Sequence, residues 1–235
     1  MTKLFLSAEW RHLIMLNYEV DPEILIPYIP AGTELDLWKG RAFISLVGFM
    51  FLNTRVCGFS FPFHRNFEEV NLRLYLKRTV LDEERRGVAF IKEIVPRRTL
   101  AYIANRLYNE NYIALPMRHR IETNPLSAEY SWNFNNKWQT ISAIADGAPQ
   151  IPQKNSEAEF ITEHYWGYSG KAPQRALEYQ VKHPPWRVSN VTDYEIDVDV
   201  CALYGSHFGP FLEKPPVSVF LAEGSDVQVF RGTRL

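Results

Sequence analysis

The segment Phe67–Arg78, with the sequence FEEVNLRLYLKR, has the two-residue alternation of a β-strand with one polar and one apolar face. Successive side chains of a strand point to opposite sides. One side carries a row of polar groups: Glu69, Asn71, Arg73 and Tyr75. The other side carries aliphatic groups: Val70, Leu72, Leu74 and Leu76. The aliphatic side requires a packing partner, so this strand predicts a sheet with at least one covered face.

A second strand follows directly. Residues 82–87, DEERRG, are typical of a charged, solvated turn, and Gly87–Val95 then returns as the partner of an antiparallel hairpin. Lys92 lies on this returning strand. We expect its amine to be exposed because lysine is rarely buried, although an inward orientation stays open.

Further strands are expected on both sides of the hairpin. They are residues 11–20, 34–38, 42–52, 117–122, 128–134, 138–144, 177–182, 188–200, 217–222 and 227–231. The segment Ala42–Leu52 has little polar alternation, so we expect it to be buried on both faces. The last two strands are expected to be joined by a turn at residues 223–226, EGSD.

A few short helices are also predicted. Asp21 followed by Pro22 is a typical helix start, with Asp at the N-cap and Pro at the first position. Thr99–Tyr108 has one apolar stripe, with Thr99 as the expected N-cap, and a capping box at residues 156–159 starts another helix. No alternation of strands and helices indicates a parallel sheet. We therefore expect a mainly β (α+β) fold, either an antiparallel barrel or a pair of packed sheets.

Composition narrows the class of protein. The chain has 235 residues, a net charge of −1 and 46% hydrophobic residues. A nucleic-acid or strongly basic membrane partner is not expected, because both need a positive excess. Its two cysteines have no CxxC partner, and the apolar stretch at the N-terminus is too short for a signal peptide. We expect a cytoplasmic protein with a single domain over residues 1–235.

The polar row is the main candidate for chemistry. It is either the solvent-facing side of an amphipathic strand or the lining of an interior. In an interior, Arg73 would hold a carboxylate or phosphate in a bidentate clamp, and Glu69 would act as an acid or base with a pKa raised by burial. The six histidines have no metal-binding spacing, and no nucleotide or cofactor motif occurs, so neither a metal nor a cofactor is expected.

The same row also resembles a family motif. The stretch 67–75 resembles the F-x-E-x-N-x-R-x-Y pattern of the YqjF-like family of bacterial proteins, which is grouped with the acetoacetate decarboxylase-like superfamily. Other stretches resemble the same family in the same order: Trp10, Asp21-Pro22, 29–36, 38–47, 160–168 and 183–186. The resemblance covers most of the chain and implies an antiparallel β-barrel with a few flanking helices and an internal cavity.

The resemblance does not imply that this chain catalyses the decarboxylase reaction. Those enzymes form a Schiff base through a lysine of a Pro-Lys-Lys motif, which follows a helix. Residues 105–108 of this chain resemble the end of that helix. The positions that match the lysine pair are then close to Ile113 and Ala114. Neither side chain forms an imine. Three other lysines lie near matched motifs: Lys92, Lys171 and Lys182. Glu69, or its neighbour Glu68, resembles one active-site glutamate of those enzymes. The position of their other glutamate falls near Ile44 or Ser45, so that glutamate is missing.

Two functional hypotheses follow. The first is a small-molecule-binding barrel with lyase-like chemistry on a small keto or hydroxy acid, without a Schiff-base lysine. The second is a non-catalytic sensor or carrier of a small ligand. Both expect a small anionic organic ligand, and a homo-oligomer stays open. The candidate site consists of Glu69 as acid or base and five ligand-binding residues: Arg73, Asn71, Tyr75, Arg106 and His183. His183 is alternatively part of a structural turn beside a buried Trp186.

Overall fold

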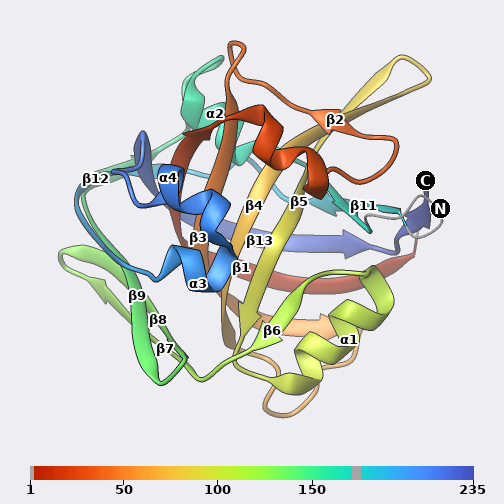
Figure 1. Ribbon diagram of the computed structural model, residues 1–235. Helices are drawn as coiled ribbons and strands as arrows, with labels where there is room; N and C mark the ends of the chain where they lie inside the picture. The colour runs from red at the N-terminus through yellow and green to blue at the C-terminus, as the bar shows by residue number, and fades with distance from the viewer. Residues whose placement is uncertain (1–2, 171–175) are drawn as a thin grey trace.

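The computed structural model describes residues 3–170 and 176–235 (Figure 1). Its strands are β1 (Leu4–Val20), β2 (Glu34–Leu35), β3 (Ala42–Val56), β4 (Phe67–Val80), β5 (Glu83–Val95), β6 (Tyr112–Ala114), β7 (Met117–Thr123), β8 (Leu126–Phe134), β9 (Lys137–Gln150), β10 (Trp166–Ser169), β11 (Leu177–Lys182), β12 (Val188–Asp197), β13 (Ser218–Phe230) and β14 (Thr233–Arg234). Its helical segments are η1 (Pro22–Tyr28), α1 (Arg98–Tyr108), α2 (Glu157–Thr162), α3 (Val200–Tyr204), η3 (Ser206–Phe208) and α4 (Gly209–Leu212). The expected mainly β class with a few short helices is confirmed.

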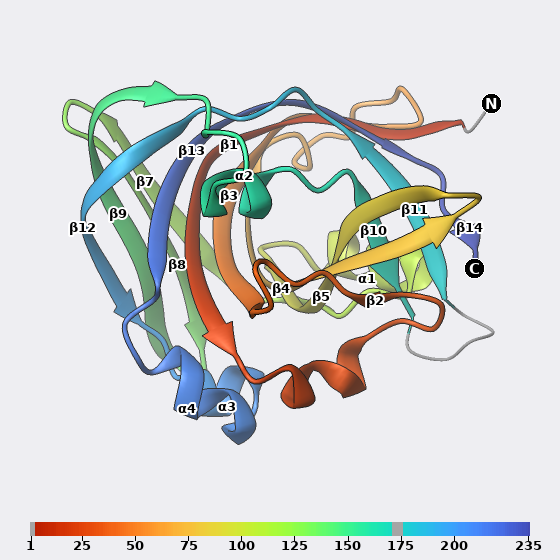
Figure 2. The same cartoon turned by 90° about the horizontal axis from the view of Figure 1, so that it is seen from above.

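The strands pair in a ring. The order β11-β10-β5-β4-β3-β1-β13 is hydrogen-bonded throughout, and β13 pairs with β11 through Val181 and Val229, which returns the pairing to its start. Figure 2 shows these strands curving around a common centre, with α2 close to one end. Side chains on the inner face of this ring therefore point toward one another rather than toward bulk water.

A second layer covers the outside of the ring. From β13 the sheet continues through β12, β9, β8 and β7, which lie beside β1 and β3 in Figure 2. Between the layers is a core of aliphatic and aromatic side chains that includes Leu72, Tyr130 and Ile141. Gly48 on β3 permits the close approach, because a Cβ there would lie 2.8 Å from the Tyr130 ring. The aliphatic side of β4 therefore has the packing partner that its sequence requires.

Most pairings are antiparallel, including the predicted β4–β5 hairpin and the pairing of β3 with β4. The first ten residues of β3 are all buried, as expected from the sequence. Two pairings are parallel: β10 with β5, and β6 with β5. The second of these makes β5-α1-β6 a small crossover unit, which the sequence analysis did not predict. Its returning strand has only three residues, too short for a recognisable periodic pattern.

Three local predictions were wrong. The charged turn expected at residues 82–87 is shorter, because β5 begins at Glu83 and its residues 83–86 already pair with β4. Residues 223–226 do not form a turn between two strands, because β13 runs through them without interruption. Gly224 adopts φ 75° there, and a Cβ would lie 1.9 Å from the Trp10 carbonyl oxygen of β1, so the glycine serves a close strand contact. In α1 the N-cap is Arg97 rather than Thr99, whose hydroxyl bonds the His64 ring instead. The Asp21 cap of η1 is confirmed by its bond from the Glu23 amide, 2.9 Å.

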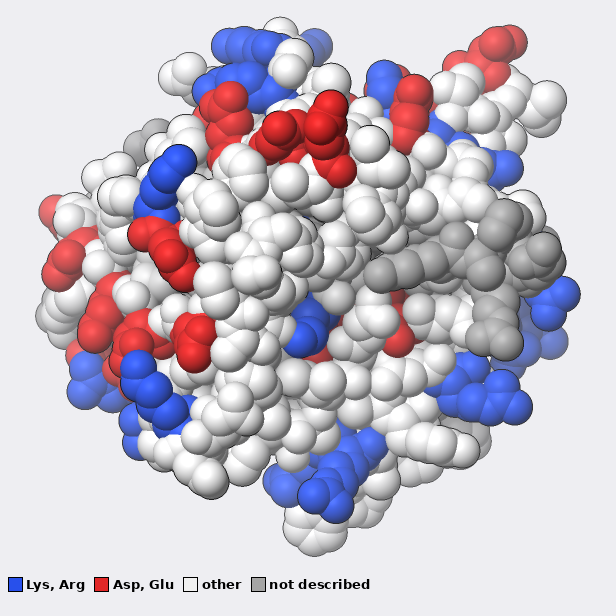
Figure 3. Space-filling model, in the orientation of Figure 1, with Lys and Arg blue, Asp and Glu red and all other residues white. Residues whose placement is uncertain are grey.

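The surface carries both signs of charge. Figure 3 shows acidic and basic side chains interspersed on the face seen in Figure 1. Among the described residues, no helix is long and apolar enough to cross a membrane.

Candidate functional site

The inner face of the ring lines a cavity of about 550 Å³ that is partly open to solvent. Glu69, Asn71 and Arg73 line it from β4, and all three are buried. Their alternation with the outward-packed Val70 and Leu72 is the one predicted from the sequence. The interior interpretation of the polar row therefore holds, and the solvent-facing one does not.

A β-bulge decides which side chains β5 contributes. Leu72 pairs with Lys92 and Arg73 pairs with Phe90, so Ile91 is an extra residue in β5. The bulge shifts the alternation, so Phe90 and Glu93 both line the cavity although they are three residues apart. Lys92 is turned to the outer face, where its ammonium group donates to the Leu203 carbonyl oxygen. The open possibility that Lys92 points inward is thereby excluded.

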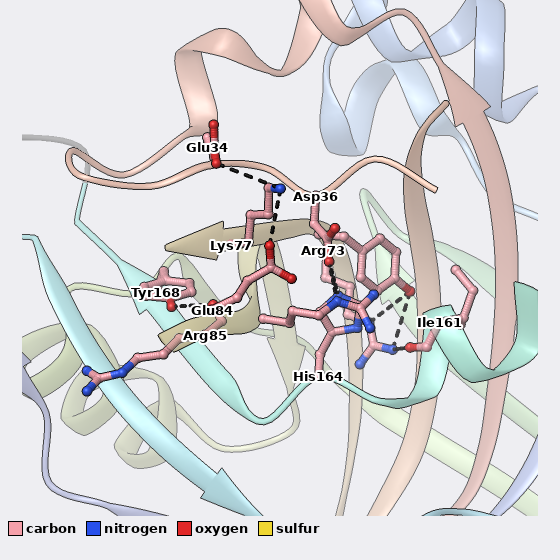
Figure 4. A network of polar contacts seen from close by, with 11 residues as sticks. Glu34, Asp36, Arg73, Lys77, Glu84, Arg85, Ile161, His164 and Tyr168 are labelled. Carbon is pink, nitrogen blue, oxygen red and sulfur yellow. Dashed lines mark hydrogen bonds and ion pairs between the residues drawn. The ribbon is translucent and has the colours of Figure 1, made fainter. Parts of the chain in front are cut away.

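Arg73 is a buried cation that forms no ion pair with any described residue. Its Nη2 donates to the carbonyl oxygen of Ile161 at 3.1 Å, and its Nε and Nη2 lie 3.4 Å from the Tyr75 hydroxyl. Figure 4 shows the guanidinium between Ile161 and His164. The third nitrogen, Nη1, has no partner among the described residues. A planar donor in this position is suited to a ligand carboxylate.

Tyr75 stands behind Arg73 rather than in the cavity wall. Its hydroxyl shares a hydrogen bond of 2.5 Å with Ser45 Oγ, which in turn donates to Asn17. Tyr75 is buried and is not among the residues that line the cavity. Its place in the predicted site is therefore that of a support for the guanidinium.

His164 lines the cavity next to Arg73 and was missed as a site residue. It follows α2, and its Nε2 lies 3.1 Å from Asp36 Oδ2, which also accepts from Arg86 Nε at 2.6 Å. Burial lowers the pKa of His164 to about 4, so its ring is neutral at pH 7. The segment 160–168 was singled out only by resemblance, since a lone histidine has no spacing pattern.

Three carboxyl groups that line the cavity lie close enough together for their charges to interact: Glu69, Glu93 and Glu110. Glu69 accepts from Asn71 Nδ2 and from the Tyr112 hydroxyl, each at 3.0 Å. Burial raises the pKa of Glu69 to about 7 despite these bonds. The expected raised pKa of Glu69 is thus present, and its cause is desolvation.

The two other glutamates also have raised pKa values. Burial raises the pKa of Glu93 well above its usual range, and the nearby Glu110 and Glu69 charges raise it further. Burial raises the pKa of Glu110 to about 8, against the hydrogen bond of 3.0 Å that the Tyr179 hydroxyl donates. At neutral pH this cluster therefore holds protons that free glutamates would have released.

The sequence analysis missed Glu93, Glu110, Tyr112 and Tyr179 as site residues. Glu93 faces inward only because of the bulge at Ile91. Glu110 follows Asn109, which ends α1 in the left-handed conformation. Apolar side chains form most of the remaining wall, among them Trp10, Leu13, Val47, Phe49, Phe51, Phe67 and Phe90.

Of the two remaining predicted site residues, His183 lines the cavity and Arg106 does not. His183 lines the cavity and stacks on Trp186, with ring centroids 4.3 Å apart, so both interpretations of this turn apply. Arg106 is exposed on α1 and does not line the cavity, so we remove it from the site. The apolar stripe of α1 instead places Leu100, Ile103 and Ala104 along the cavity.

No lysine of the described residues lines the cavity. Lys182 is exposed and lies over the Phe230 ring, and Lys171 falls outside the described residues. Ala114, one of the two positions that match the lysine pair by resemblance, contributes with Tyr112 to the inner apolar cluster from β6. Among the described residues, no group of three or more metal-binding side chains is arranged to hold an ion.

Comparison of the sequence with known proteins identifies the family of this chain. The model of DUF2071, a family described as an uncharacterized conserved protein, matches residues 7–226. The chain belongs to this family. It is 27% identical over 213 residues to the uncharacterized protein YqjF of Bacillus subtilis (strain 168), covering 88% of this chain and 84% of that protein. The resemblance noted from the sequence motifs is confirmed.

Solved structures with this fold are acetoacetate decarboxylase-like. An acetoacetate decarboxylase from Legionella pneumophila superposes with a TM-score of 0.69 at 11% identity, covering 98% of this DUF2071 chain and 87% of that chain. The enduracididine biosynthesis enzyme MppR, complexed with pyruvate, gives 0.68 at 13% identity over 99% and 90%. An acetoacetate decarboxylase-like enzyme from Sphingomonas wittichii RW1 gives 0.67 at 10% identity over 99% and 93%. At these identities the likeness concerns the fold alone.

Proposed function

We propose that the cavity, surrounded by strands as in a β-barrel, binds a small organic acid, with Arg73 as the residue that receives the carboxylate. The observation that carries this proposal is the buried guanidinium without an ion pair and with a free Nη1 at the cavity wall. Burying a cation without a counter-charge is unfavourable, and a bound anion removes that penalty. Tyr75 and the Ile161 carbonyl hold the guanidinium in place.

We further propose a chemical step on a keto or hydroxy acid. With its carboxylate at Arg73, such an acid extends along the β4 row toward Glu69. A carboxyl group with a pKa of about 7 can accept and donate a proton at neutral pH, so Glu69 is the candidate acid or base. The step is lyase-like and proceeds without an imine, because no described lysine lines the cavity.

The absence of a lining lysine among the described residues also favours the second candidate, a sensor or carrier that binds the acid without converting it. The two candidates differ in one observable. A solved structure of MppR is complexed with pyruvate, and this acid is a suitable probe here. Enzymatic proton abstraction would exchange the methyl protons of pyruvate for deuterium in heavy water, as followed by proton NMR, whereas a carrier would bind pyruvate without exchange.

The binding proposal is tested by titrating hexanoate into the protein and into two arginine variants. Trp10, Trp166 and Trp186 line the cavity, so tryptophan fluorescence is a direct readout beside calorimetry. We expect Arg73→Ala to weaken hexanoate binding at least about tenfold, as loss of a charge-assisted bidentate contact does. Arg106→Ala is the matched control, because this arginine is exposed and outside the cavity.

Equal hexanoate affinity in the wild type and Arg73→Ala would contradict the proposal, as would no binding of any small acid. If Arg73→Ala does not fold, Arg73→Lys replaces it. Lysine keeps the charge but loses the planar fork, so an intermediate loss of affinity is expected.

A further inference from the structure

Several buried acceptor atoms in the cavity residues have no hydrogen-bond partner. They are Asn71 Oδ1, Glu93 Oε2 and His164 Nδ1. Each of these residues is more than nine-tenths buried. The Asn71 amide nitrogen is already used by Glu69, which leaves its oxygen free. The neutral His164 ring faces Asp36 with Nε2, which therefore carries the hydrogen and leaves Nδ1 as an acceptor.

Buried polar atoms in proteins are nearly always paired, and an unpaired group in a cavity indicates a missing partner. Asn71 Oδ1 and His164 Nδ1 accept hydrogen bonds, and Glu93 Oε2 accepts them once its carboxyl group has lost its proton. Arg73 Nη1 is a donor nitrogen of the β4 row that has no partner among the described residues. A simple carboxylic acid would satisfy the arginine and leave the acceptors as they are. His164 Nδ1 lies beside Arg73, whereas Asn71 and Glu93 belong to the part of the cavity that holds Glu69. The partner that Asn71 Oδ1 and Glu93 Oε2 lack is a group rich in N–H donors.

The carboxyl cluster points to the charge of that group. Glu69, Glu93 and Glu110 approach from β4, β5 and the end of α1, and their neighbours from the surrounding elements are tyrosines: Tyr108, Tyr112 and Tyr179. No described cation pairs with any of the three carboxyl groups. An ammonium group among them would receive hydrogen bonds and charge compensation together, and it would lower their pKa values so that protons leave.

We propose that the ligand is a zwitterion, with its carboxylate on Arg73 and an ammonium group among Glu69, Glu93 and Glu110. This inference rests on the proposed function and names its substrate class. Arg73 and Glu69 are four residues apart on β4, so their Cα atoms are separated by about 13 Å. That span suits an amino acid whose charges are several methylenes apart, and the apolar walls between the two ends cover the methylenes.

A matched series of six-carbon compounds tests the proposal by calorimetry at pH 7.5: 6-aminohexanoate, hexanoate and hexylamine. We expect 6-aminohexanoate to bind at least about tenfold tighter than hexanoate, as an added charge-assisted contact should. In Glu93→Gln the ratio of the two dissociation constants should fall to within about threefold. Glu122→Gln, an exposed glutamate on β7, is the control that should keep the ratio.

Proton release gives a second readout. Titrations in two buffers with different ionisation enthalpies should report proton release on binding of 6-aminohexanoate, and less in Glu93→Gln. Equal affinities of 6-aminohexanoate and hexanoate, both dependent on Arg73, would overturn the zwitterion and leave the acid-binding function standing. Binding of hexylamine alone, or of none of the three compounds, would overturn the zwitterion and the proposed function together.

Discussion

The two faces of β4 differ in what they contribute to the protein. The outer face places Val70, Leu72 and Leu74 in the core between the ring and the second layer. The inner face places Glu69, Asn71 and Arg73 around a cavity, where the pKa of Glu69 is raised and Asn71 Oδ1 has no hydrogen-bond partner. One strand thus stabilises the fold on one side and holds destabilising polar groups on the other. Buried polar groups that lower stability and gather in one place are typical of a functional site.

The largest effect on stability is expected on the outer face. Leu72→Ala removes a fully buried side chain from the core and should lower the free energy of unfolding by about 3–5 kcal/mol. Urea unfolding followed by circular dichroism measures the change. A loss below about 1 kcal/mol would mean that the outer face is not the tightly packed side.

A smaller, pH-dependent effect is expected on the inner face. The pKa of Glu69 is about 7 in the folded state, above its ordinary 4.5, so the folded protein binds its proton more tightly than the unfolded chain. This contribution to stability is fully present below pH 4.5 and is lost as the pH rises toward 7. Glu69→Gln cannot ionise and should gain stability relative to the wild type across this window, by at most about 3 kcal/mol.

Urea unfolding at pH 5 and pH 8 measures this difference. The wild type and Glu69→Gln should differ more at pH 8 than at pH 5. A constant difference at the two pH values would mean that Glu69 is not a buried carboxyl group with a raised pKa.

The smallest expected effect is on ligand affinity, and it compares the neighbouring residues Lys92 and Glu93. Lys92 and Glu93 are adjacent in sequence and so lie on opposite faces of β5. The bulge at Ile91 decides that Glu93, not Lys92, faces the cavity. Lys92→Met should therefore change hexanoate affinity less than about twofold, since the outer face does not contact the cavity. A large loss of affinity in this variant would place Lys92 inside and contradict the bulge.

Much of the fold was predictable from local pattern. Alternation alone separated the two faces of β4, and the charged turn predicted its hairpin with β5. The family motifs then predicted the likeness to acetoacetate decarboxylase-like folds. Turn residues were misleading at 223–226, because a glycine that serves close strand packing has the same local sequence as one in a turn.

The candidate site was only half predictable. Glu69, Asn71 and Arg73 share one strand, so their common face follows from the period of two. The glutamates that join Glu69 depend on tertiary features, a bulge in β5 and the left-handed end of α1, which leave no periodic signal. Arg106 was misplaced because its helix turns its apolar stripe, not its arginine, toward the cavity.

The most direct test of the account is a crystal structure of the protein soaked with 6-aminohexanoate. The account predicts electron density along the inner face of β4, with the carboxylate within hydrogen-bond distance of Arg73 Nη1 and the amine among the three glutamates. Ordered water alone at Arg73 and Glu69, under conditions where calorimetry detects binding, would contradict it and place the ligand elsewhere on the protein.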